Sequence, residues 1–204
     1  MYTGIVQGKE SVLSLNKNNG FSTLIVSNHN HFFTDVTVGA SVAIDGTCLT
    51  VTQFNDDNVA FDISDFTTDT TTLKFLAMGD EVNIERSHQM NKENGGHSLY
   101  GHMEGMAEVV EFTATGETYR LVIRIPQDNI QYFFLRGFIG LHGCSLTING
   151  IDEENKTIAL NLIPETLRMT NLGKIKVGDF LNYEIDQTTR TIVDTLSRTL
   201  SRRS

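Results

Sequence analysis

The chain has 204 residues, 39% hydrophobic and 20% charged, so it is long enough for one large core or two small ones and too apolar to be disordered. Its net charge of −9 disfavours binding to the phosphate backbone of nucleic acids. No apolar run approaches the roughly 20 residues that span a bilayer. The N-terminal stretch MYTGIVQGKE lacks the basic and apolar parts of a signal peptide, so we expect a cytoplasmic protein. Two cysteines, Cys48 and Cys144, predict no disulfide framework.

The first half of the chain alternates short apolar runs with turn signals. The runs are residues 41–44, 49–51, 59–63 and 82–84, and the turns between them are 45–46, 55–57 and 78–80. The polar segment 27–36 predicts a short helix or a loop. Regular spacing of this kind predicts a small antiparallel sandwich or a closed barrel of about six strands.

The second half of the chain repeats the first. GASVAIDGTCLTVT at residues 39–52 matches GFIGLHGCSLTIN at residues 137–149, which places Cys48 on Ser145 at an offset of 97 positions. Farther along, FDISDFTTDTTTLKFLAMGDEVNIE matches LNLIPETLRMTNLGKIKVGDFLNYE at an offset of 99. Because a register held over separated segments signals duplication, the sequence predicts two copies of one unit.

The duplication predicts the division of the chain. We expect a first barrel over residues 1–90 and a second over residues 97–187, joined by the polar linker NKENGG at 91–96.

The C-terminal segment, residues 188–204, differs from the rest. Its apolar residues recur at helical spacing, and they are Ile192, Val193, Leu196 and Leu200. Two completed barrels leave this stripe no core to join, so we expect it to pair with other copies of the chain in a helical bundle. Packing of the helix against its own barrel is the alternative.

Few sequence motifs in the chain carry chemistry by themselves. Neither GxxxxGK[ST] nor GxGxxG is present. His97 and His102 stand five apart, an odd spacing that sends them to opposite faces of a strand, and no cysteine pair accompanies them, so no metal site is predicted.

Two pairs of small polar residues do suggest a pocket. Cys48 with Thr50, and Ser145 with Thr147, stand two apart on predicted strands, so each pair faces one side. Side chains of this kind can line a ligand pocket with hydrogen-bonding groups. The alternative is that they are small polar groups in a barrel wall.

Several longer motifs identify a family. The chain contains MYTGIVQG, GTCLTVT, GGHSLYGHMEG, GCSLTI, LIPETLRMTNLG and VGDFLNYEID. In this series the sequence resembles riboflavin synthase of the trimeric α-chain type, nearly from end to end. The resemblance implies an all-β fold of two similar six-stranded antiparallel Greek-key barrels, plus a C-terminal helix that gathers three subunits.

The resemblance also implies a reaction that needs no cofactor. Two molecules of 6,7-dimethyl-8-ribityllumazine exchange a four-carbon unit, which yields riboflavin and 5-amino-6-ribitylaminouracil. Each barrel would hold one lumazine, and the active site would form where the first barrel of one subunit faces the second barrel of another. Holding two reactants in place can contribute up to ~7–11 kcal/mol.

The site residues follow from the same resemblance. It implies a first-barrel pocket made of Gly4, Ile5, Val6, Cys48, Leu49, Thr50, Asp62, Ile63, Ser64 and Thr67. It implies a second-barrel pocket made of Gly101, His102, Met103, Ser145, Leu146, Thr147, Asn161, Leu162, Ile163, Pro164, Glu165 and Thr166. For catalysis it implies proton handling by His102 and Asp186, binding of ring or ribityl oxygens by Ser145 and tuning of the opposite pocket by Cys48. Tyr2 stands where the family usually has Phe and would pack beside the bound ring.

Three departures from the family pattern stand out. The first repeat reads SDFTTDTTTL in place of a copy of ETLRxTNL. Arg136, counted among the substrate-binding residues, replaces an expected lysine, and His142 replaces an expected Asp. The altered first pocket makes a non-catalytic lumazine- or flavin-binding protein the alternative function, although such binders tend to lose the residues equivalent to Cys48 and His102.

Overall fold

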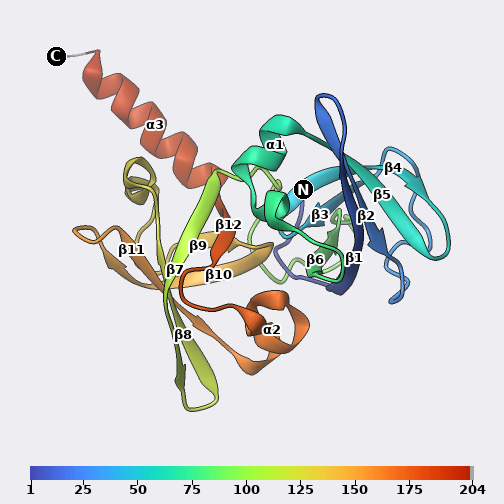
Figure 1. The fold of residues 1–204 in the computed structure, drawn as a ribbon. Coiled ribbons are helices and arrows are strands. Elements are labelled where there is room, and N and C mark those ends of the chain that lie inside the picture. Colours follow the sequence, from blue (N-terminus) through green and yellow to red (C-terminus); the bar gives the residue numbers. More distant parts are fainter. Residues whose placement is uncertain (203–204) are drawn as a thin grey trace.

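The chain forms two closed antiparallel barrels of six strands each, followed by a helix (Figure 1). The computed structural model describes residues 1–202. The predicted fold class is confirmed. The last two residues of the predicted C-terminal segment, 203 and 204, lie outside the described residues.

The first barrel closes in the order β1-β2-β5-β4-β3-β6. Its strands are β1 (Gly8–Lys17), β2 (Phe21–Ser27), β3 (Ser41–Ile44), β4 (Thr47–Phe54), β5 (Asn58–Ser64) and β6 (Glu81–Arg86), with helices α1 (Asp65–Thr70) and η1 (Thr72–Phe75) between the last two. The polar segment after β2 forms turns, in agreement with the predicted loop.

The second barrel repeats this topology. Its strands are β7 (Gly105–Thr115), β8 (Thr118–Arg124), β9 (Phe138–Leu141), β10 (Cys144–Asp152), β11 (Thr157–Leu162) and β12 (Phe180–Ile185), with helices η2 (Gln127–Tyr132), α2 (Pro164–Met169) and η3 (Asn171–Lys174). The register shift between Val12 and Ser14 recurs between Val109 and Glu111, at the offset of 97 that relates the two sequences. The duplication therefore extends to the irregularities of the strands.

Each barrel has its own hydrophobic core. Alternation along the strands sends one set of side chains inward, such as Leu24 and Phe61 in the first barrel and Leu121 and Leu160 in the second. A smaller cluster of Tyr2, Ala43 and Leu99 is formed by segments that precede the two barrels and by β3.

The segments that precede the two barrels are exchanged between them. Tyr2 and Leu99 pair antiparallel. From the first segment, the Gly4 carbonyl accepts a hydrogen bond from Ser145 N–H in the second barrel at 2.8 Å. From the second segment, the Gly101 carbonyl accepts one from Cys48 N–H in the first barrel at 2.9 Å. Each barrel is thus completed by the segment that precedes the other, and we call these segments the N-terminal arm (residues 1–7) and the second arm (residues 97–104).

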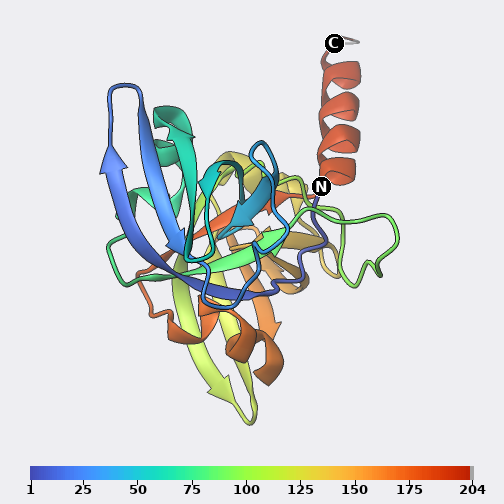
Figure 2. The ribbon, with the colours of Figure 1, turned by 90° about the vertical axis from the view of Figure 1, so that its right-hand side faces the viewer.

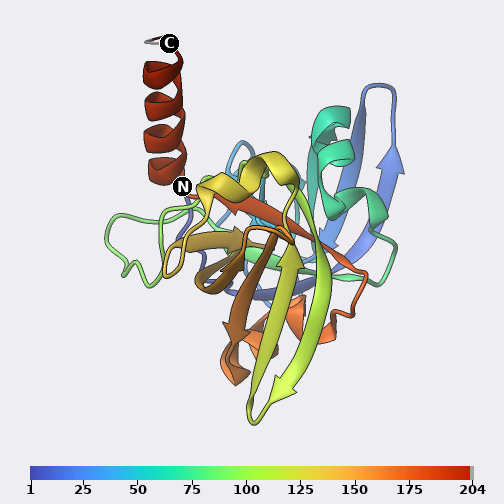
Figure 3. The ribbon, with the colours of Figure 1, turned by 90° about the vertical axis from the view of Figure 1, so that its left-hand side faces the viewer.

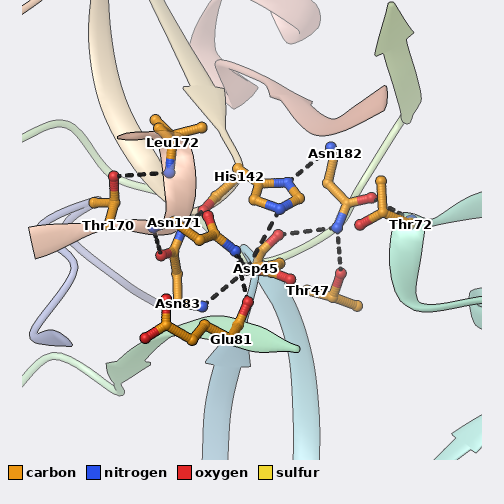
Figure 4. Close-up of polar contacts among 10 residues, drawn as sticks. All are labelled: Asp45, Thr47, Thr72, Glu81, Asn83, His142, Thr170, Asn171, Leu172 and Asn182. Carbon is orange, nitrogen blue, oxygen red and sulfur yellow. Dashed lines mark hydrogen bonds and ion pairs between the residues drawn. The ribbon is translucent and has the colours of Figure 1, made fainter. Parts of the chain in front are cut away.

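Two tight turns meet where the barrels join (Figure 4). A Cβ atom on Gly46 would lie 2.7 Å from the Gly143 nitrogen, so only glycine allows this approach. The carbonyl of Asp45 accepts from Asn182 Nδ2 at 3.0 Å, and that of His142 accepts from Asn83 Nδ2 at 2.9 Å. The junction therefore has approximate twofold symmetry.

The unusual His142 has a physical role at this junction. Its Nε2 lies 3.4 Å from Asp45 Oδ1, and both side chains are buried. An aspartate at this position would place two carboxylates together near the symmetry axis, where burial already raises the pKa of Asp45. The histidine provides a partner for the carboxylate in place of a second acid.

Helix α3 (Gln187–Ser201) projects away from both barrels (Figures 2 and 3). Near its base, Tyr132 Oη donates to Asp194 Oδ1 at 2.6 Å, and Arg190 pairs with Glu104. Its apolar stripe is exposed, with Ile192 at 55%, Leu196 at 57% and Leu200 at 66%. The helix therefore does not pack its stripe against its own barrel. Among the described helices, none has the length and apolar character required to cross a membrane.

Candidate functional site

A cavity of about 320 Å³ opens on the outer face of the second barrel. It is formed by the N-terminal arm, the start of β10, and α2 with its flanking residues. Its lining residues are Gly4, Ile5, Val6, Cys144, Ser145, Leu146, Ile163, Glu165, Thr166, Met169 and Thr170. Five of the twelve positions that the resemblance implies for a second-barrel pocket therefore lie together, and they are Ser145, Leu146, Ile163, Glu165 and Thr166.

One predicted grouping is wrong. The N-terminal residues Gly4, Ile5 and Val6 line the second-barrel cavity, although we expected them in the first-barrel pocket. Correspondingly, Gly101 lies against Cys48 of the first barrel, where a Cβ on Gly101 would be 2.5 Å from the Cys48 Cβ. The exchanged arms are the reason, because each arm precedes one barrel in the sequence and covers the other in space.

Ser145 lies at the base of this cavity and is held by His97. The backbone N–H of His97 donates to Ser145 Oγ at 3.1 Å, and His97 Nδ1 lies 2.6 Å from the same oxygen. The His97 ring stacks on Phe138, with centroids 5.1 Å apart. Burial lowers the pKa of His97, so its ring is neutral near pH 7 and can accept the Ser145 proton. From the sequence, His97 is considered as a metal ligand but is not assigned to either pocket, because nothing in the first repeat corresponds to it.

The first barrel has a different partner at the equivalent position. Tyr2 Oη donates to Cys48 Sγ at 3.1 Å, and the Tyr2 ring is buried between the arms. Burial and the Cys48 contact raise the pKa of the Tyr2 phenol, so it remains a hydrogen-bond donor. The two barrels therefore present a serine held by an imidazole and a cysteine held by a phenol.

Alternation along β4 and β10 places some of the predicted pocket residues on the outer side of each strand and others on its core side. Cys48 and Thr50 lie on the outer side of their strand, as do Ser145 and Thr147, whereas Leu49 points into the core. Ile63 and Leu162 are also core residues. The shared orientation of each polar pair agrees with the strand prediction, and the core positions contribute packing instead of ligand contacts.

The corners that follow β5 and β11 differ most between the repeats. At the second corner, Arg168 donates to both carboxylate oxygens of Glu165, at 2.6 and 2.9 Å, which lowers the pKa of Glu165. The offset of 99 places Phe66 and Asp69 at these positions in the first barrel. The Phe66 side chain is 78% exposed, and Ser64 caps its helix through Thr67 N–H at 3.2 Å. The first corner therefore lacks the charged pair of the second.

The other residues of the predicted sites lie outside the cavity. Asp62 accepts from Thr23 Oγ1 at 2.8 Å, and the backbone N–H of Asn161 donates to Asn149 Oδ1 at 3.1 Å. His102 and Arg136 are exposed. Asp186 caps α3 by accepting from Thr189 N–H at 2.7 Å, and it lines a separate cleft beside Ser98 and Tyr100. Pro164 begins α2, and Met103 is half-buried in the second arm. Asp186 interacts electrostatically with His97, the partner of Ser145, whereas His102 is exposed, and the catalytic roles of both residues stay predictions.

Buried glutamates hold both arms and predict a pH dependence of stability. Glu184 accepts from Tyr100 N–H at 2.7 Å and from Gly101 N–H at 2.9 Å, and burial raises the pKa of Glu184 to about 7. A raised carboxyl pKa favours the protonated form in the folded state, so its contribution is present at low pH. We expect this contribution to fall by up to about 1.4 kcal/mol per pH unit as the pH rises from about 4.5 to about 7.

Urea unfolding across this pH range measures the effect. The Glu184→Gln variant should show a shallower fall in its unfolding free energy than the parent chain. Glu165→Gln is the control, because Glu165 is exposed and its pKa is lowered. Equal slopes for the parent and the Glu184→Gln variant would contradict the assignment.

Comparisons with known proteins agree with this architecture. The model of the lumazine binding domain family matches residues 3–87 and 100–186. Riboflavin synthase of Escherichia coli (strain K12) is 38% identical over 204 residues, which covers 100% of this chain and 95% of the relative. Riboflavin synthase of Chlamydia pneumoniae is 37% identical over 201 residues, 98% of each chain. The crystal structure of LumP complexed with riboflavin has a TM-score of 0.84 and 29% identity, and covers 92% of this chain and 100% of LumP.

Proposed function

The chain belongs to the lumazine-binding-domain family, and from this premise we propose that it catalyses the riboflavin synthase reaction and that each barrel binds one 6,7-dimethyl-8-ribityllumazine. In this reaction two identical substrates exchange a four-carbon unit. One becomes riboflavin and the other becomes 5-amino-6-ribitylaminouracil. A duplicated barrel suits a reaction of two identical molecules, because each repeat supplies one receptor.

The second-barrel cavity is the observation that carries the proposal. It has the size of a small-molecule site, an apolar wall from Ile5, Val6 and Leu146, and polar groups on Ser145 and Glu165. A flat bicyclic ring fits against the apolar wall, and the ribityl hydroxyls can donate to the Glu165 carboxylate. The Ser145 hydroxyl then faces the ligand with a neutral imidazole behind it.

The chemistry that remains for the protein is proton transfer and orientation. Forming the new ring requires protons to leave the methyl carbons of the lumazines, and a neutral acceptor within hydrogen-bond reach can take them. In this proposal the Ser145 and His97 pair serves the ligand of the second barrel. Cys48, with Thr50, serves the ligand of the first. Exposed His102 supplies a further acid or base where two barrels face each other.

The two bound lumazine rings must also come into contact, and we propose that they do so at an interface between subunits. The exposed stripe of α3 supports assembly of three chains, which would bring the first barrel of one chain against the second barrel of the next. Proximity of this kind can contribute up to ~7–11 kcal/mol to a bimolecular step.

A carrier of lumazine or flavin is the second candidate function. The altered first corner, with Phe66 and Asp69 in place of a Glu–Arg pair, favours it, as does the likeness to LumP, whose structures hold a lumazine, riboflavin or flavin mononucleotide. Mixing the purified chain with 6,7-dimethyl-8-ribityllumazine and following the absorbance of riboflavin separates the two functions. Turnover supports the enzyme, and tight binding without turnover supports the carrier.

The Ser145→Ala variant tests the binding site directly. Loss of one pocket hydrogen bond costs about 0.5–1.5 kcal/mol, so we expect lumazine to bind roughly two- to tenfold more weakly. Fluorescence titration with lumazine measures the change. Ser14→Ala, on β1 and outside the cavity, is the control and should leave affinity unchanged. If Ser145→Ala binds as tightly as the parent chain, Ser145 only packs.

A further inference from the structure

Two buried glutamates occupy equivalent positions in the two repeats. They are Glu85 on β6 and Glu184 on β12, related by the offset of 99. Each is only 4% exposed, and burial raises the pKa of both carboxyl groups. Burying a carboxylate is costly unless hydrogen bonds satisfy its oxygens. Both glutamates receive such bonds from an arm, so the cost of burying them is offset by contacts that fix the arms in place.

Glu85 holds the N-terminal arm. The backbone N–H groups of Thr3 and Gly4 donate to its two carboxylate oxygens, at 2.6 and 3.1 Å. Thr3 Oγ1 donates to Glu85 at 2.8 Å and accepts from Ile5 N–H at 3.3 Å. The Ile5 N–H belongs to the same peptide group as the Gly4 carbonyl, which accepts from Ser145 N–H at 2.8 Å. A continuous chain of hydrogen bonds therefore joins Glu85 of the first barrel to Ser145 of the second.

Glu184 holds the second arm in the same way. The backbone N–H groups of Tyr100 and Gly101 donate to its two oxygens, at 2.7 and 2.9 Å. The Gly101 carbonyl accepts from Cys48 N–H at 2.9 Å. Each barrel therefore supplies the carboxylate that fixes an arm against the other barrel.

The position of the N-terminal arm determines the shape of the second-barrel cavity. Gly4, Ile5 and Val6 form one side of this cavity, and Ser145 lies opposite them on β10. Glu85 does not line the cavity, so it acts on a ligand there only through the arm. Binding residues must be held within about 0.5 Å of their working geometry, and hydrogen bonds in a chain strengthen one another. A carboxylate at the start of such a chain is therefore suited to fix a ligand site that it does not touch.

A third buried glutamate provides the comparison within the chain. Glu10, on β1, is 2% exposed. It accepts from Ser27 Oγ at 2.6 Å and from the backbone N–H of Asn30 at 2.8 Å. Glu10 thus resembles Glu85 in burial and in hydrogen bonding, but it holds the segment after β2 instead of an arm. The arm contacts distinguish Glu85 and Glu184 from a glutamate that only stabilises its own barrel.

We propose that Glu85 and Glu184 are positioning residues that act across the junction, with Glu85 fixing the ligand site of the second barrel and Glu184 that of the first. The inference rests on the proposed function for the identity of the ligand. A carboxylate offers two acceptor oxygens to the two N–H groups of an arm, whereas an amide side chain offers one. A glutamine at either position leaves one N–H of the arm against another donor, so the arm separates more readily from the strand that it covers.

Hydrogen exchange at single amides of the full chain tests the proposal. The Ser145 N–H reports the contact with the N-terminal arm, and the Cys48 N–H reports the contact with the second arm. At pH 8, Glu85→Gln should raise the exchange rate of the Ser145 N–H about tenfold and leave that of Cys48 unchanged. Glu184→Gln should have the opposite pattern. The control Glu10→Gln should leave the ratio of the two rates as in the parent chain.

The same measurement with 6,7-dimethyl-8-ribityllumazine gives the affinity of each barrel separately. A ligand that contacts both the arm and the strand slows the opening between them, so half-maximal protection of each amide occurs at a concentration set by its own site. Glu85→Gln should raise this concentration about tenfold at Ser145 and leave it unchanged at Cys48. A purely structural role, which loosens the barrel that carries the glutamate, would not produce this pattern.

The outcomes distinguish this inference from the proposed function. If Glu85→Gln accelerates exchange of both amides alike or of neither, or leaves the lumazine concentration at Ser145 unchanged, this inference alone is wrong. If lumazine protects neither amide of the parent chain, the proposed function is wrong and this inference with it.

Thr3→Val is a milder variant that decides the question if Glu85→Gln does not fold. Thr3 is 7% exposed, and valine keeps its shape while removing the hydroxyl that links Glu85 to Ile5. We expect exchange of the Ser145 N–H to rise about two- to tenfold, with that of Cys48 unchanged. An unchanged rate at Ser145 in this variant would overturn the proposal.

Discussion

A chain carrying Leu196→Asp should lose the proposed assembly of three chains and most of its activity. Leu196 lies in the middle of the exposed stripe of α3, between Ile192 and Leu200. Burying each such side chain contributes about 1.5–3 kcal/mol, and a bundle of three helices buries three copies of each. A carboxylate at this position would place three like charges in one apolar seam. Contacts near the base of the helix fix its direction, so the stripe cannot turn to compensate.

Sedimentation velocity and riboflavin formation measure this effect together. Thr191→Asp is the matched control, because it adds the same charge to an exposed position away from the stripe. We expect this control to assemble and to be active like the parent chain. A Leu196→Asp chain that sediments as a trimer would refute the role of the stripe. A monomeric chain with full activity would refute the shared site.

Gly4→Ala should abolish lumazine binding at the second barrel and destabilise the chain. Gly4 has a φ of +72°, and a Cβ there would lie 2.5 Å from Ser145 Cβ and 2.6 Å from Ser145 N. The added methyl group forces the N-terminal arm away from β10, which opens the cavity and breaks the bond between Gly4 and Ser145. We expect a loss of about 2–4 kcal/mol in the free energy of unfolding, from overpacking and left-handed backbone strain together.

Gly20→Ala separates these two causes. Gly20 also has a positive φ, +88°, but a Cβ there has nothing within 4 Å. This variant should therefore cost about 1–2 kcal/mol, the backbone strain alone, and leave lumazine affinity unchanged. Urea unfolding and fluorescence titration measure both variants. If both variants lose the same free energy of unfolding, the close approach of Gly4 to Ser145 does not contribute to the cost of Gly4→Ala.

Much of this molecule could be predicted from the sequence, because the relevant signals are local or repeat at a fixed offset. Strand alternation placed Cys48 and Thr50 on one face, and helical spacing predicted the stripe of α3. The repeat predicted two like barrels, down to turns such as Asp45-Gly46. These features depend on the spacing of apolar side chains along a strand or helix and on the backbone conformations that turn residues prefer. A short stretch of residues determines both.

Only the tertiary structure decided which barrel each segment serves. The arm at Gly4 precedes the first barrel and lines the cavity of the second, and no periodicity distinguishes the two because the barrels are nearly alike. The contacts of His97 with Ser145 and of His142 with Asp45 join residues far apart in the sequence. The hydrogen bonds of Glu85 and Glu184 to the two arms likewise join segments far apart in the sequence. A local pattern reports which face of a strand is buried, and the packing of distant segments decides what it is buried against.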